Sequence, residues 1–351
     1  LTVTRGNAQE LLQAVEREEC RRSLLAFLAF GHIQEPVLPN VPGSGGVIPF
    51  EMWPHLREFA LDLLAHRLVV KGKARQLGFT WLVAAYLDWL CNYHPGTDGL
   101  WLSKSEPDAA EGLGRVATWH SLMPPHLVTP WAKPPIALTL DYANSSHLTA
   151  MASTENAGRG RAFSVVVQDE ADFHPHLSEN FAAVKPTIDA GGQLIMLSSM
   201  DKRKVDSLFR NIIRGAPENG WHKSFTGWSA RPGRDQAWYD KTRANVPASA
   251  GMSPELFMEQ EYPSTEMEML APSRAVAYFD VDSLNAAMLD TMPARETIGA
   301  LSIWRRAVVG GKYTMFADTA WGVTGSFNCG AVFDWQTNEQ MAELHGRLHP
   351  Q

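Results

Sequence analysis

The spacing of apolar residues changes along the chain. Between Ala8 and Ala29 they recur at helical intervals, which predicts an N-terminal helix. A run rich in proline and glycine, from Pro36 to Pro49, then breaks the pattern and predicts a loop. From Leu68 onward short apolar runs alternate with longer helical segments. This alternation is typical of a parallel sheet flanked by helices, so we expect an α/β fold.

Five apolar runs are the expected strands of this sheet: Leu68–Val70, Gly99–Ser103, Leu148–Ala152, Ser164–Gln168 and Gln193–Ser198. The stretch from Pro254 to Pro272 has regularly spaced prolines and suggests a connection. Two later runs, 312–318 and 328–335, predict the opening of another sheet. The expected organisation is therefore an N-terminal helix and loop (1–49), a nucleotide-binding domain (50–270), a connector (271–305) and the start of a second domain (306–351).

Composition narrows the class of protein. With 351 residues and 45% hydrophobic content, the chain can bury one large core or two smaller ones. The longest apolar stretches, such as Leu24 to Phe30, are far shorter than a membrane span, and the residues from Leu1 to Glu10 do not resemble a signal peptide. The three cysteines are widely separated, which predicts buried thiols in a reducing compartment. A formal charge of −7 means that any nucleic-acid contact must come from a local patch or from assembled subunits.

The segment from Val69 to Thr80 reads as a strand, a glycine-containing loop and the beginning of a helix. Such a loop directs backbone N–H groups and a helix N-terminus at a phosphate chain, and the hydroxyl of Thr80 could then bind Mg²⁺. The usual pattern is G-x-x-x-x-G-K-[ST], but Phe79 occupies the lysine position here. Lys73, at the other end of the loop, could still reach the phosphates, with Arg75 assisting. By itself the segment is better explained as an ordinary strand-to-helix turn with surface cations.

A second motif strengthens this interpretation. The β-branched run Val165–Val167 leads into Asp169 and Glu170, where a buried strand would reach the carboxyl edge of the sheet. Asp169 is the expected Mg²⁺ ligand, and Glu170 would orient and deprotonate the attacking water. Another apolar run ends in Ser198 and Ser199, small polar residues suited to sensing the γ-phosphate. The three motifs in this order indicate a P-loop ATPase with one nucleotide-binding sheet.

Two other features have competing interpretations. Basic and aromatic residues gather between Lys202 and Trp238, so this segment is the best DNA-facing candidate by composition, but a solvated helix followed by an aromatic packing loop explains it equally well. Isolated histidines such as His55, His120 and His174 are more often packed or solvated than metal ligands. We therefore assign no zinc site from the sequence.

With these motifs in view, the chain resembles the large terminases of tailed bacteriophages, in the branch whose phosphate-loop lysine lies at the start of the loop. The segment from Lys73 to Thr80 carries this resemblance. It explains why Phe79 can occupy the usual lysine position, because in this branch the lysine is at the start of the loop. The resemblance implies an ATP-hydrolysing motor that drives double-stranded DNA into a procapsid, with ATP and Mg²⁺ as cofactors. The nucleotide-binding residues would be Lys73, Arg75, Gln76, Gly78, Thr80, Ser198 and Ser199.

The resemblance also implies further roles. The phrase from Ala157 to Arg161 is similar to a segment of the family whose arginine reaches a neighbouring subunit's ATP site, and Arg159 matches that arginine better than Arg161. The run ending at Asp318 looks like the first strand of an RNase H-like nuclease, which makes Asp318 a ligand of a divalent metal. Family members often read adenine with a glutamine near an aromatic-proline pair. Trp53-Pro54 lacks this glutamine, so we expect Trp53 to be a core residue.

The expected partners, also implied by the resemblance, are duplex DNA, a portal protein, a small terminase subunit and further copies of the chain in a pentameric ring. The expected location is the cytoplasm of an infected bacterium, with transient attachment to the procapsid. Two alternatives remain. Asp169 to Asp172 spells the tetrad of DEAD-type helicases, but a helicase needs a second RecA-like domain. The other alternative is a scaffold protein with this fold and no turnover.

Overall fold

A computed structural model describes residues 5–37, 44–204, 206–247, 253–271, 287, 291–318 and 328–346. The chain divides into two compact units, Leu1–Ala277 and Tyr278–Gln351. Each unit is described by itself. Among the described helices, none combines the length and the apolar character that crossing a membrane requires.

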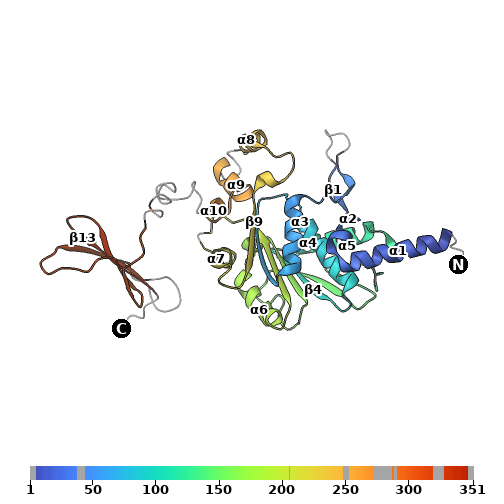
Figure 1. The fold of residues 1–351 in the computed structure, drawn as a ribbon, viewed down its shortest axis with the longest axis horizontal. Helices are drawn as coiled ribbons and strands as arrows, with labels where there is room; N and C mark the ends of the chain where they lie inside the picture. The colour runs from blue at the N-terminus through green and yellow to red at the C-terminus, as the bar shows by residue number, and fades with distance from the viewer. Residues whose placement is uncertain are drawn as a thin grey trace. The chain divides into compact units, whose positions relative to one another are not determined.

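A seven-stranded sheet forms the centre of the first unit (Figure 1). Its order is β5 (Thr139–Asp141), β6 (His147–Ala152), β4 (Asp98–Ser103), β7 (Val165–Asp169), β8 (Gln193–Ser198), β3 (Leu68–Lys73) and β9 (His222–Thr226). All neighbours are parallel except β5 and β6. The five strands expected from the sequence are thus confirmed, whereas β5 and β9 were not foreseen. Because the central strands are parallel, the carboxyl ends of β3, β7 and β8 lie at one edge of the sheet.

Helices cover both faces of this sheet. One face carries α3 (Pro54–Ala65), α4 (Phe79–Tyr93) and α5 (Glu106–Leu122), and the other carries α6 (Leu177–Asp189) and α7 (Leu208–Gly215). Three further helices follow β9: α8 (Gln236–Ala244), α9 (Pro254–Glu261) and α10 (Glu266–Leu270). Successive strand residues point to opposite faces. Val69 and Val167 therefore join the core beneath α3, α4 and α5, while Val70 and Val166 join the core beneath α6 and α7. Burial on both faces explains why the strands read as continuous apolar runs rather than alternating ones.

The N-terminal segment differs from the expectation of one helix and a loop. The helix is divided at Ser23 into α1 (Arg5–Arg22) and α2 (Leu24–Ala29), because Ser23 is extended and its hydroxyl accepts from the N–H of Ala26 as an N-cap. The Pro/Gly-rich run contains an antiparallel hairpin, β1 (His32–Glu35) and β2 (Gly46–Pro49). Phe27 of α2 is fully buried in the same core as α4, so this segment is part of the first unit.

The second unit is an antiparallel sheet in its described part. Its strands have the order β10 (Glu296–Ile298), β11 (Leu301–Ile303), β14 (Gln340–Gly346), β13 (Asn328–Asp334) and β12 (Tyr313–Asp318). The strands expected at 312–318 and 328–335 are confirmed as β12 and β13. The stretch 271–305, expected to be a connector, contributes β10 and β11 to this sheet. Asp318 is exposed at the end of β12 and pairs in register with Cys329.

Candidate functional site

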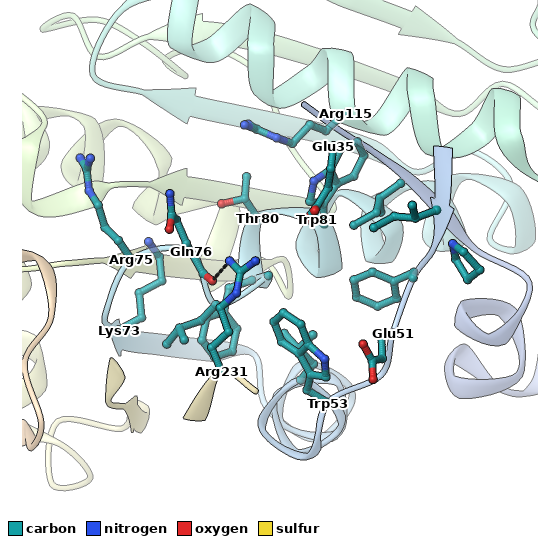
Figure 2. A pocket seen from close by; sticks show the side chains of 18 of the residues that line it. Glu35, Glu51, Trp53, Lys73, Arg75, Gln76, Thr80, Trp81, Arg115 and Arg231 are labelled. Carbon is teal, nitrogen blue, oxygen red and sulfur yellow. Dashed lines mark hydrogen bonds between the residues drawn. The ribbon is translucent and has the colours of Figure 1, made fainter. Parts of the chain in front are cut away.

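The phosphate loop links the end of β3 to α4. Gly78, the N-cap of α4, has φ +83°, and a Cβ there would lie 3.1 Å from the side chain of Leu56. This left-handed conformation and close approach both favour glycine. The turn aims the N-terminus of a 15-residue helix at a cavity of about 790 Å³ (Figure 2). The cavity is lined by Lys73, Gln76, Thr80 and Glu170 among others, so it brings together residues from two of the sequence motifs.

Phe79, which replaces the usual lysine, is 1% exposed and belongs to the core. Its ring makes edge contacts with Phe59 and His55, at centroid distances of 5.2 and 5.4 Å, and the Nζ of Lys71 lies 4.7 Å from its centre. A lysine at this position would place a charge in the same apolar contacts. The cation of the site must therefore come from elsewhere in the loop.

Lys73 is a buried cation at the end of β3, where the loop begins. Its Nζ lies 2.7 Å from Oε1 of Glu170, and its side chain is 6% exposed. Glu170 follows the last residue of β7 with φ +51°, a conformation that a residue with a side chain adopts only at a cost. The bend lets the carboxylate turn back toward the phosphate loop. The structure thus brings together Lys73 and Glu170, which lie 97 positions apart in the sequence.

The hydroxyl pair at the end of β8 faces the same carboxylate. The backbone N–H of Ser199 donates to Oε2 of Glu170 at 3.2 Å, and the hydroxyls of Ser198 and Ser199 are 3.4 and 3.5 Å from that oxygen. Ser198 also accepts from the N–H of Asp172 at 3.1 Å, which ties β8 to the turn after β7. A change in the position of Glu170 would therefore alter these contacts at the end of β8.

The two adjacent carboxylates are electrostatically distinct. Burial, reinforced by the negative charge of Glu170, raises the pKa of Asp169. Burial also opposes the charge on Glu170, but the neighbouring Lys73 ammonium outweighs it and holds the pKa of Glu170 below its ordinary value. Two buried carboxylates beside one ammonium favour a further cation. Carboxylate and hydroxyl oxygens are the donors that Mg²⁺ takes, and Asp169 and Thr80 offer one of each, although Thr80 lines the cavity and Asp169 does not.

Two arginines that the sequence interpretation had placed toward DNA instead hold the phosphate loop. Arg231 donates to the carbonyl of Gln76 at 2.7 Å, and Arg234 donates to the carbonyl of Arg75 at 2.8 Å and to the side chain of Gln76 at 2.9 Å. Glu261 pairs with the guanidinium of Arg75 at 2.5 Å. The side chains of Arg75 and Gln76 were expected to bind nucleotide. In the structure they instead contact Glu261 and Arg234, respectively. No spacing in the sequence signals contacts across more than 150 residues.

Other residues of the cavity wall were also missed. Trp53, expected in the core, packs against it but is only partly buried and also lines the cavity, with the guanidinium of Arg231 5.4 Å from its ring centre. Its Nε1 is buried and has no hydrogen-bond partner among the described residues. Arg115 of α5 lines the cavity from the other side, where it pairs with Glu111 at 2.6 Å. Figure 2 shows Trp53 beside Arg231, and Arg115 near Glu35.

The glycine-rich loop before β7 separates the two candidate arginines. Arg161 pairs with Asp98 at 3.0 Å, at the first residue of β4 and so at the opposite edge of the sheet from the phosphate loop. Arg159 is exposed between Gly158 and Gly160, which both have positive φ. The residues lining the cavity of the same chain do not include Arg159. The exposed Arg159 is thus the better placed of the two to reach another molecule.

Comparison with known proteins identifies the fold. No protein-family model matches the sequence. The crystal structure of the HK97 bacteriophage large terminase is similar over 91% of this chain and 66% of that chain, with a TM-score of 0.50 and 12% identity. The ATPase domain of the Thermus phage P74-26 large terminase is 18% identical over 58% of this chain and 90% of that one, with a TM-score of 0.42.

A third structure, the large terminase of a thermophilic bacteriophage in complex with ADP, is 9% identical over 84% of this chain and 69% of that chain, with a TM-score of 0.46. This chain spans just under two thirds of the length of the HK97 protein. The chain therefore has the α/β fold of the bacteriophage large terminases.

Proposed function

We propose that this protein is the ATP-hydrolysing motor of viral DNA packaging, a terminase large subunit that moves duplex DNA into a procapsid. The observation that carries the proposal is the cluster of Lys73, Glu170 and Ser199, which the ends of β3, β7 and β8 bring together beside the phosphate loop. A cation, a base and a hydroxyl-lined strand end at one helix N-terminus are what phosphoryl transfer to water requires.

The ion pair between Lys73 and Glu170 suggests how these residues act. A bound triphosphate offers Lys73 a stronger partner than one carboxylate, so the ammonium transfers to the phosphates and releases Glu170. The freed carboxylate accepts the proton of the attacking water, while the N–H of Ser199 keeps Oε2 in place. Asp169 and Thr80 would hold Mg²⁺, which neutralises charge on the phosphates when it is bound.

The arginines that hold the phosphate loop offer a route from the ATP site to DNA. Arg231 and Arg234 belong to the segment between β9 and α8, and Glu261 ends α9. Because all three contact the loop residues Arg75 and Gln76, a loop that closes on phosphate must pull on α8 and α9. We propose that this movement of α8 and α9 is the step that exerts force on DNA. We also propose that copies of this chain form a pentameric ring. The ring would work with a portal protein and a small terminase subunit, in the host cytoplasm and transiently on the procapsid.

ATP turnover with and without duplex DNA tests the proposal most directly. We expect the untagged protein to hydrolyse ATP with Mg²⁺ and duplex DNA to stimulate the rate, since a motor couples the two events. Phosphate release measures both rates. If the folded protein binds ATP but releases no phosphate under either condition, the alternative of a scaffold protein without turnover is supported. Strand separation of a forked duplex would instead support the alternative of a DEAD-type helicase.

The second unit does not itself supply the second RecA-like domain that a helicase needs. A second RecA-like domain needs a parallel sheet, but the described strands of residues 278–351 are antiparallel throughout. In addition, Asp172 is 1% exposed and accepts from the N–H of Asp201 at 2.7 Å. It therefore holds the chain segment that follows β8 and does not line the cavity. Asp318 remains a proposed nuclease ligand.

The wall around Trp53 is the proposed site of the adenine base. An aromatic face contributes about 1–3 kcal/mol to stacking with a base, roughly 5- to 150-fold in affinity, and the partly buried Trp53 falls toward the lower end. We therefore expect Trp53→Ala to raise the KM for ATP by about tenfold while leaving kcat largely unchanged. Trp53→Phe, which retains a stacking face, should recover most of this loss. Equal KM values for all three proteins would place the base elsewhere in the cavity.

A further inference from the structure

Three side chains of the first unit converge far from the phosphate loop, at the amino ends of the strands. Asp62 and His66 lie one turn apart at the end of α3, and His222 is the first residue of β9. One atom from each, an imidazole nitrogen or a carboxylate oxygen, lies within 4.8 Å of the others. From these residues we propose a binding site for a divalent transition metal of the Zn²⁺ class, independent of the proposed ATPase activity.

The fold explains why distant residues meet here. β3 and β9 are parallel neighbours, and Val69 is the register partner of His222. His66 precedes β3 by two positions and is the C-cap of α3, with its N–H bonded to the carbonyl of Asp62. The turn from α3 into β3 therefore places His66 next to the first residue of β9. The two imidazole rings lie nearly parallel, with an interplanar angle of 5° and centroids 3.9 Å apart.

The contact between His222 and Asp62 points to coordination rather than to a hydrogen bond. Nε2 of His222 is 3.0 Å from Oδ1 of Asp62, yet this covered nitrogen has no hydrogen-bond partner among the described residues. Ligands of one tetrahedral zinc lie roughly 3.3 Å apart, because each bond is about 2.0–2.1 Å, and they point at the metal instead of at each other. The approach of Nε2 to Oδ1 is short but misaligned for a hydrogen bond, as for two ligands of one ion. Because the planes of the two imidazoles are stacked, one ring must rotate about its side-chain bonds for both histidines to reach that ion.

The donor set selects the class of metal. Two imidazoles and one carboxylate suit zinc, cobalt or nickel, whereas Mg²⁺ and Ca²⁺ prefer oxygen ligands alone. His66 is exposed and the other two residues are partly buried, so an ion can enter from solvent and keep water as a fourth ligand. The sequence had given no reason to assign zinc, because two of the ligands lie about 160 positions from the third.

A metal here would fasten an edge strand. Among the described strands, β9 pairs only with β3, and at its far end the carbonyl of Thr226 accepts from the N–H of Ala74, the first residue of the phosphate loop. Joining His222 to the end of α3 would fix the amino end of this strand. We therefore infer a structural role, in which the ion raises the thermal stability of the first unit.

Zinc titration of the metal-stripped, untagged protein tests the site. We expect calorimetry to show one Zn²⁺ per chain at this site and a Tm increase on the order of 5 °C at a hundredfold excess over Kd. Co²⁺ should give the intense visible absorption of a four-coordinate site, and Mg²⁺ should give no shift. Asp62→Asn, His66→Gln and His222→Gln should each abolish the zinc-dependent shift, with far-UV circular dichroism confirming that the variants fold.

His147→Gln is the matched control, because His147 also pairs with an aspartate, Asp141 at 2.6 Å, but without a second histidine. This variant should retain the full zinc shift. Absence of zinc binding by the native protein overturns the proposal. So does binding that persists in all three site variants, which would assign the metal to other groups such as the exposed thiol of Cys329. Co²⁺ spectra of the native protein decide the matter if any variant fails to fold.

Discussion

Replacing Glu170 with glutamine is expected to lower ATP turnover by about 10²- to 10⁴-fold, the usual contribution of a general base. Glutamine keeps the size and the hydrogen bond from the N–H of Ser199, but it cannot accept the proton of the attacking water. It also removes the partner of Lys73, which currently lies 2.7 Å away. The variant should therefore bind ATP as tightly as the native protein or more tightly. Single-turnover phosphate release and nucleotide titration measure the two effects separately.

A second lysine–glutamate pair supplies the control. Lys223 and Glu266 also lie 2.7 Å apart and are partly exposed, but neither lines the cavity. Glu266→Gln breaks an ion pair of the same length without touching the base, so its turnover should stay within about twofold of the native rate. Near-normal turnover in Glu170→Gln would remove Glu170 from its role. Loss of ATP binding in the same variant would show that the carboxylate supports the loop rather than the reaction.

The central strands could be predicted from the sequence because both of their faces are buried. Val165 to Val167 carries no polar position, and a run of this kind between turn signals has few alternatives to a buried parallel strand. The acidic pair that follows then marks the carboxyl edge of the sheet. Lys73 and Glu170 could therefore be assigned to one site before their separation of 2.7 Å was known.

The contacts around the loop could not be predicted, because they depend on tertiary structure. Arg231 and Arg234 look like a DNA-binding cluster by composition, yet they donate to the carbonyls of Gln76 and Arg75. Trp53 looks like a core residue and does pack against the core, but its partly buried indole also lines the cavity. Composition indicates which groups can form hydrogen bonds. It does not indicate which backbone they will meet.

Removal of the Arg159 guanidinium is expected to lower ATP turnover by about 10³- to 10⁵-fold, the contribution of an arginine finger that stabilises the transferring phosphate. Arg159 is exposed and does not line the cavity of its own chain, so we expect it to act in a neighbouring copy. Arg159→Ala chains keep their base, and Glu170→Gln chains keep their finger. Mixing the two inactive proteins should therefore restore part of the activity, because some neighbouring pairs regain a complete site.

Two further arginines make this experiment specific. Arg161 pairs with Asp98 at the start of β4. Arg161→Ala should therefore lower the stability of the fold while leaving ATP turnover, which takes place at the opposite edge of the sheet, largely unchanged. Arg115 lines the cavity in the same chain and is the competing source of positive charge. If Arg115→Ala abolished turnover while Arg159→Ala did not, the charge would come from within the chain and no neighbour would be needed. Turnover plotted against the mixing ratio distinguishes these cases, since a finger that acts in trans gives a maximum at an intermediate ratio and a residue that acts in cis gives none.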